Sequence, residues 1–178
     1  MYGIGERIVY GAEGVCRVEN VGPLEMRGVE RGMDYYTLSP LYREGRIFIP
    51  VDTDVYTRPV ITKEEADDLI ARIPEIPEEV YENSNPRLLN EHYQTYLKNY
   101  DCEGLVRLIR AIYAKGRSAA GKGRRLGQVD ERSMKRAEEM LHGELAAALD
   151  MSPQEVKEYI CRTVEHGGKD REETKGIC

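Results

Sequence analysis

The chain has 178 residues and a formal net charge of −6; 40% of its residues are hydrophobic and 33% are charged. This length fits one medium domain or two small ones, because domains span roughly 50–250 residues. The longest apolar run is far shorter than the roughly 20 residues of a membrane-spanning helix, and the first residues lack a signal-peptide pattern. The composition excludes a wholly disordered or membrane-embedded chain and predicts a cytoplasmic globular protein.

The four cysteines are far apart in the sequence, with no C-x-x-C pair and no histidine placed to complete a zinc pattern. Disulfide scaffolds carry their cysteines more densely in shorter chains. We therefore expect reduced thiols, no metal and no cofactor.

The charge is unevenly distributed. Residues 1–83 carry 9 basic and 17 acidic side chains, residues 84–142 carry 12 and 7, and residues 143–178 carry 5 and 8. A basic middle in an acidic protein indicates local contact with a polyanion instead of bulk electrostatic attraction.

The first 55 or so residues alternate apolar and polar side chains between glycine- and proline-containing turns, which predicts short strands. The expected strands span residues 7–10, 15–21, 35–42 and 46–51, with a hairpin loop over 27–33. Pro50 cannot donate to a strand ladder, so it belongs at a strand end or a sheet edge. The apolar run of residues 47–49 is either core or an edge strand offered to a partner.

From Thr62 onward the hydrophobic period is helical and predicts about five helices. Thr62–Glu65 and Ser152–Glu155 have the spacing of capping boxes. The other expected helix starts are Pro86, Asp101 and Asp130. Residues 74–79 are expected to form a linker, residues 115–127 a loop, and the residues after 167 a frayed tail.

The loop expected over 115–127 allows two interpretations. Gly116–Lys122 has the spacing of a phosphate-binding G-x-x-x-x-G-K loop, but Gly123 follows where a Ser or Thr should bind Mg²⁺. The plainer interpretation is a flexible basic loop. Its cations, followed by Arg132, Lys135 and Arg136 on one helix face, could neutralise phosphates or simply be solvated.

Catalytic patterns are poor. The three histidines accompany no H-E-x-x-H, no G-x-S-x-G and no paired-carboxylate signature, and His142 is expected to pack within a helix. We therefore expect no enzyme.

Several segments resemble the CarD/CdnL family of transcription regulators over residues 2–160. They are residues 4–10, 14–15, 35–38, 47–51, 93–97, 105–113 and 136–146. The resemblance implies a Tudor-like N-terminal module, shared with the transcription-repair coupling factor, that pairs strands with the RNA polymerase β subunit. It also implies a helical domain that contacts promoter DNA near the upstream edge of the melted region, where a Trp wedges into the minor groove. The motor motifs of the coupling factor are absent, so the chain resembles the stand-alone regulator.

The chain departs from the family pattern at several positions. It has no Trp, and the wedge position falls at or near Leu89. Polymerase-contacting arginines of relatives fall near Leu24 and Phe48, so that contact would rest on backbone pairing. The family's Asp, Pro and His in the opening strand and turn are here Glu6, Gly11 and Glu13.

We therefore expect an α+β protein. A small bent sheet or partial barrel over residues 1–60 precedes a helix and linker (61–83), a helical DNA-contacting domain (84–166) and a flexible tail (167–178). The expected polymerase-binding residues are Arg46, Ile47, Phe48, Ile49 and Pro50. The expected DNA-binding residues are Arg87, Leu89, His92, Arg124, Arg125, Arg132, Lys135 and Arg136. The expected regulator is a nucleoid-associated monomer that modulates open-complex stability at initiation with little base specificity; the alternative is a protein-interaction adaptor without a DNA role.

Overall fold

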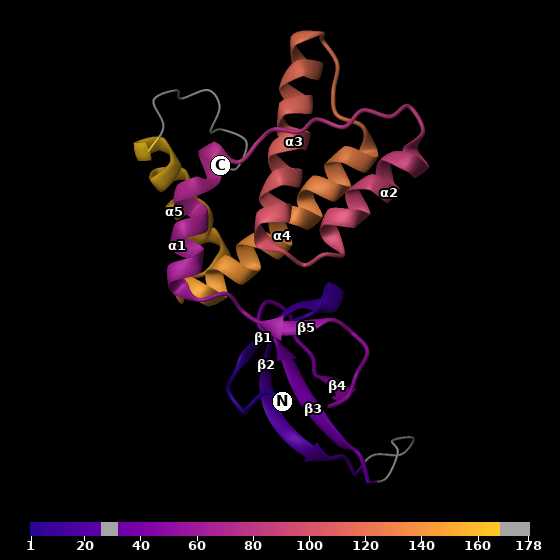
Figure 1. The fold of residues 1–178 in the computed structure, drawn as a ribbon, viewed down its shortest axis with the longest axis vertical. Helices are drawn as coiled ribbons and strands as arrows, with labels where there is room; N and C mark the ends of the chain where they lie inside the picture. The colour runs from indigo at the N-terminus through magenta and orange to yellow at the C-terminus, as the bar shows by residue number, and fades with distance from the viewer. Residues whose placement is uncertain (26–31, 168–178) are drawn as a thin grey trace. The chain divides into compact units, whose positions relative to one another are not determined.

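The computed structural model describes residues 1–25 and 32–167, with the side chains of the last helix described as far as Val164. The chain divides into two compact units, Met1–Val60 and Ile61–Cys178 (Figure 1). Most of the expected 27–33 hairpin loop, and the expected flexible tail beyond Gly167, lie outside the described residues. Among the described residues, no helix is long and apolar enough to cross a membrane.

The first unit is an antiparallel sheet of five strands in the order β4-β3-β2-β1-β5. The strands are β1 (Arg7–Tyr10), β2 (Gly14–Pro23), β3 (Asp34–Pro40), β4 (Ile47–Pro50) and β5 (Thr57–Pro59). Four of them lie where the alternation predicts strands; β5 is too short to show an alternation. A register shift between Val18 and Asn20 marks an irregularity in the β2–β3 ladder of the kind that bends a sheet locally.

One face of this sheet forms the core of the first unit. Ile8, Cys16, Val18 and Leu38 are fully buried, and Tyr36 and Ile49 join their cluster. These residues come from β1, β2, β3 and β4, where alternate side chains point to the same face. Burial raises the pKa of the Cys16 thiol to about 11, so this cysteine is a core residue and not a reactive thiolate.

The second unit contains five α-helices in the described residues. They are α1 (Lys63–Arg72), α2 (Pro86–Leu97), α3 (Cys102–Gly121), α4 (Gln128–Leu149) and α5 (Pro153–Gly167). The helix count and the α+β class are confirmed. The capping box at Thr62 is confirmed by reciprocal bonds with Glu65, and that at Ser152 by bonds with Glu155.

The predicted loop over residues 115–127 is wrong in its first half. The helix α3 continues to Gly121, because Gly116 packs beside Leu126 and the residues that follow it include the helix-forming Ala119 and Ala120. Asp130 is also not the N-cap of α4. Gly127 holds that position, and Asp130 lies three residues inside, where its carboxylate accepts the Gly127 N–H.

The helix α4 is central to the second unit and packs against each of the other four helices. Ala137, Leu141 and Leu145 on α4 are fully buried. The helix α1 contributes Ala66, Leu69 and Ile70 to the same core. Residues 61–72, which follow the sheet directly, therefore fold as part of the helical unit.

Candidate functional site

The strand β4 provides a free sheet edge in the first unit. It pairs with β3 in the register Tyr35↔Pro50 to Leu38↔Ile47 and is the last strand in the order. Its other side therefore presents backbone N–H and C=O groups with no partner strand among the described residues. Such an edge can accept an added strand from another protein.

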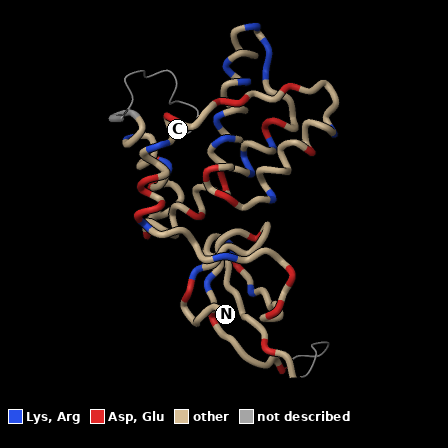
Figure 2. Tube along the Cα trace, viewed as in Figure 1, with Lys and Arg blue, Asp and Glu red and all other residues tan. Residues whose placement is uncertain are grey.

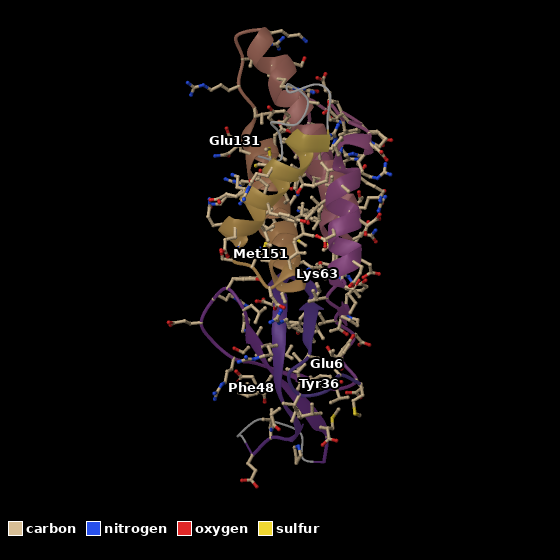
Figure 3. The ribbon with its side chains drawn as sticks, turned by 90° about the vertical axis from the view of Figure 1, so that its left-hand side faces the viewer. Glu6, Tyr36, Phe48, Lys63, Glu131 and Met151 are labelled. Atoms are coloured by element: carbon tan, nitrogen blue, oxygen red, sulfur yellow. The ribbon has the colours of Figure 1, made fainter. Side chains whose placement is uncertain are left out.

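Side chains alternate along β4. Ile49 is 5% exposed and belongs to the core, while Phe48 is 40% exposed. Figure 3 labels Phe48 on β4 and Tyr36 on the neighbouring β3. Arg46, which precedes the strand, is exposed and forms an ion pair with Glu19 (Nε to Oε2, 3.3 Å). The residues predicted to bind a partner thus form one edge, with one large apolar side chain facing outward.

The opposite edge is formed by β5, which has three residues against the four of β4. Both strands end at a proline, which lacks a backbone N–H, so hydrogen-bonding capacity alone does not separate the two edges. The exposed Phe48 does, because β5 consists of Thr57, Arg58 and Pro59 and has no large apolar side chain.

The beginning of α2 carries the predicted wedge. Asn85 caps the helix by accepting the Arg87 N–H (3.0 Å), and Pro86 occupies the first helical position. Leu89 is 6% exposed and lies in the helical core, so its side chain is not available to a base step. The wedge position predicted at Leu89 therefore needs correction, because the exposed apolar side chain is Leu88, at 45%.

The other two predicted residues of α2 differ in charge. Arg87 is exposed and forms an ion pair with Glu91 (Nε to Oε1, 3.0 Å). His92 stacks on Tyr81, with ring centroids 3.9 Å apart. Partial burial lowers the pKa of His92 below its ordinary value. At neutral pH this histidine therefore supplies a ring contact and no charge.

The first half of α4 has a basic exposed face. Arg132 and Lys135 lie one turn apart and are exposed, and neither has a carboxylate partner in the described part of the chain. Arg136 is half-buried and forms an ion pair with Glu139 (3.7 Å). The two side chains available to a new anion on this face are therefore Arg132 and Lys135.

The α3–α4 connection carries Arg124 and Arg125, both exposed. Figure 2 shows Lys and Arg positions gathered at the end of α3 and in this connection. The buried Asp130 fixes the connection, because its carboxylate accepts hydrogen bonds from the Lys115 ammonium (2.8 Å) and from the Gly127 N–H (3.2 Å). The basic residues are thus held on an ordered support.

The phosphate-loop interpretation of Gly116–Lys122 is wrong. Residues 116–121 are the last turns of α3, so most of their backbone N–H groups are used within the helix and cannot form a phosphate-binding nest. Within the described ranges, no group of three or more His, Cys, Asp or Glu side chains is arranged to hold a metal ion.

One signal in the sequence predicts that Leu88, and not Leu89, is exposed. Leu89, Tyr93 and Leu97 are spaced four residues apart and form the buried stripe of α2, whereas Leu88 lies off this stripe. The role of Asp130 has no comparable signal, because its partners, Lys115, Gly127 and the Tyr93 hydroxyl, come from three separate segments.

The free edge of β4 is a feature of an interaction module. Residues 2–61 match the family model of the CarD-like/TRCF RID domain. No curated protein matches the chain. The first unit is therefore a CarD-like/TRCF RID domain, which implies an interaction with RNA polymerase.

Proposed function

We propose that the chain is a transcription regulator that binds the β subunit of bacterial RNA polymerase through β4 and contacts promoter DNA through its helical unit. The observation that carries this proposal is that β4 is an edge strand, with Phe48 exposed, inside the matched RID domain. Strand addition supplies main-chain hydrogen bonds, and an outward aromatic side chain supplies apolar contact. A polymerase partner would place the protein in the cytoplasm, at the nucleoid.

In this proposal the helical unit binds the DNA backbone near the upstream edge of the melted region. Arg132 and Lys135 on α4, with Arg124 and Arg125 before it, supply exposed cations on ordered elements. Contacts to phosphates set position and carry no sequence information, so little base specificity is expected. Leu88 takes the wedge role, because apolar side chains can enter a base step, and the open complex is modulated as a result.

The polymerase arm is tested with the full chain carrying Phe48→Asp. A charge placed against an apolar partner surface should reduce polymerase capture about tenfold or more, since burying an unpaired charge is costly. The matched control is Val55→Asp, because Val55 is 43% exposed and lies two residues before the opposite edge strand. If both variants and the parent protein capture polymerase equally, β4 is not part of the interface.

The DNA arm is tested with Arg132→Glu combined with Lys135→Glu, measuring open-complex lifetime with polymerase present. The reversal should abolish the effect on lifetime while capture of polymerase persists. Lys63→Glu combined with Lys98→Glu is the control, because both are exposed lysines outside the proposed DNA surface. If lifetime changes equally in both double variants, or in neither, the DNA role is wrong and the adaptor alternative takes its place.

A further inference from the structure

The helical unit contains a polar pocket at the end of α3. It has a volume of about 380 Å³ and is lined by the last turns of α3, the α3–α4 connection and residues 82–84 before α2. Lys122, Arg124 and Arg125 contribute cations to its wall, and Ser84 and Ser118 contribute hydroxyl groups. Ligand pockets in proteins typically start at about 300 Å³, so the space suits a small molecule.

The charges in this pocket are only partly balanced. Its cations are Lys115, Lys122, Arg124 and Arg125, and its anions are Glu82 and Asp130. Lys115 and Asp130 form an ion pair with each other (Nζ to Oδ1, 2.8 Å). The other three cations have no ion pair with any residue that the structure describes.

This lack of partners contrasts with the arginines along α3. Arg107, Arg110 and Arg117 each have a carboxylate within 4.0 Å, supplied by Glu103, Glu78 or Glu79. The described residues thus pair Arg107, Arg110 and Arg117 with carboxylates and leave Lys122, Arg124 and Arg125 without an ion pair. Three unpaired cations around a polar concavity with hydroxyl groups form a site for an anion with several oxygens.

We propose that this pocket binds a phosphorylated small molecule of mononucleotide size, through Lys122, Arg124 and Arg125. Arginine forks and a lysine ammonium both bind phosphate oxygens, and the serine hydroxyls can donate to the oxygens that remain. The site is distinct from the excluded phosphate loop, because it uses side chains around a cavity and not a nest of backbone N–H groups. It stands independently of polymerase binding.

The test is a titration of the ¹⁵N-labelled full chain with pyrophosphate and with ADP, followed by NMR in constant salt without divalent cations. Both ligands should shift the amide signals of residues 115–130. Arg124→Ala combined with Arg125→Ala should weaken binding about tenfold or more. The control Lys63→Ala combined with Lys98→Ala removes the same charge from exposed sites outside the pocket and should change affinity less than about twofold.

Several outcomes would overturn the proposal. Absence of binding by both ligands would do so, as would an equal loss of affinity in the two double variants, since that result indicates non-specific attraction. A duplex DNA without terminal phosphates is the third probe. If the duplex shifts the same signals while pyrophosphate and ADP do not, these cations serve DNA alone. Tighter binding of ADP than of pyrophosphate would support the proposal and show that the pocket also contacts the nucleoside.

Discussion

Asp130 holds three segments of the helical unit together through one buried carboxylate. Its side chain accepts hydrogen bonds from the Tyr93 hydroxyl (2.7 Å), the Lys115 ammonium (2.8 Å) and the Gly127 N–H (3.2 Å). Burial, and secondarily the hydrogen bond to Asp130, raises the pKa of Tyr93, so the phenol stays a donor at all ordinary pH values. The middle of α2, the second half of α3 and the first turn of α4 are thereby fixed to one another by polar contacts.

Replacing Asp130 should destabilise the helical unit strongly. Asp130→Ala leaves the buried Tyr93 hydroxyl and the largely buried Lys115 without their partner, which we expect to cost about 3–5 kcal/mol of unfolding free energy. Tyr93→Phe removes only one of the three bonds and should cost about 1 kcal/mol. Urea unfolding of both variants measures the difference. Equal, small losses would show that the carboxylate does not organise the segment.

His142 is the second residue whose environment decides its chemistry. It lies on α4, and burial, with a smaller contribution from Lys157, lowers its pKa to about 4. Its Nε2 atom is buried and has no hydrogen-bond partner among the described residues. The neutral ring therefore packs in the helical unit, and the folded state resists its protonation.

Stability should consequently fall as the pH is lowered from about 6.5 toward 4. In this range the unfolded chain binds a proton at His142 that the folded chain does not, so unfolding becomes easier, by up to about 3 kcal/mol. Above pH 6.5 the contribution is constant. The nearby Glu138 has a raised pKa and acts in the opposite direction.

The difference between the parent protein and His142→Gln isolates the histidine from Glu138 and the other carboxylates. Urea unfolding of both at several pH values from 4.5 to 7.5 should show a smaller loss at low pH in the variant. If the unfolding free energies of the two proteins change with pH in parallel, His142 is freely protonated in the folded chain.

At the scale of elements, helix starts were more predictable than helix ends. Thr62, Asp101 and Ser152 carry side-chain oxygens that cap the helix behind them, and this is a local interaction visible in the sequence. The end of α3 was not predictable, because Gly116 is tolerated by packing against Leu126, which lies beyond the helix end. The exposure of Leu88 and the pairing of Arg136 likewise depend on tertiary packing, whereas the edge position of β4 depends on strand order.

The end of α3 offers a matched pair of glycine substitutions. Gly121 is helical and has open space where a Cβ would lie, so Gly121→Ala should stabilise the helical unit by about 0.5–1 kcal/mol. Gly123 has a φ of +68°, a left-handed conformation that should make Gly123→Ala destabilising by about 1 kcal/mol. Thermal unfolding of both variants shows whether each substitution raises or lowers the stability. A stabilising Gly123→Ala would show that α3 ends elsewhere.

Across the whole molecule, the acidic excess and the free basic residues occupy different segments. Residues 61–83 carry 2 basic and 8 acidic side chains, and some of these acids pair with α1 and α3 arginines, as Glu78 does with Arg110 at 3.2 Å. Among the described residues, the cluster of cations without an ion pair lies later, from Lys122 to Lys135. A net charge of −6 is thus compatible with a local anion-binding surface, but it opposes the long-range attraction of DNA to the free protein.

Binding of the free full chain to duplex DNA should therefore be weak and steeply dependent on salt. Each phosphate contact adds about −0.9 to the slope of log K against log salt. Removing two contacts with Arg132→Ala and Lys135→Ala should reduce the magnitude of the slope by about 2, whereas Lys63→Ala with Lys98→Ala should leave it unchanged. Fluorescence anisotropy over a KCl series measures the slope.

Polymerase would raise the occupancy of these DNA contacts without adding a new one. A chain docked through β4 is held beside the promoter at a high effective concentration, so contacts too weak for the free protein become occupied. In the same KCl series, promoter complexes should retain the effect of the parent chain at salt concentrations that abolish its binding to free duplex. Phe48→Asp should lose this retention while keeping the slope on free DNA. Tight, sequence-specific binding by the free chain would contradict this division of roles, because the DNA contacts would then need no polymerase.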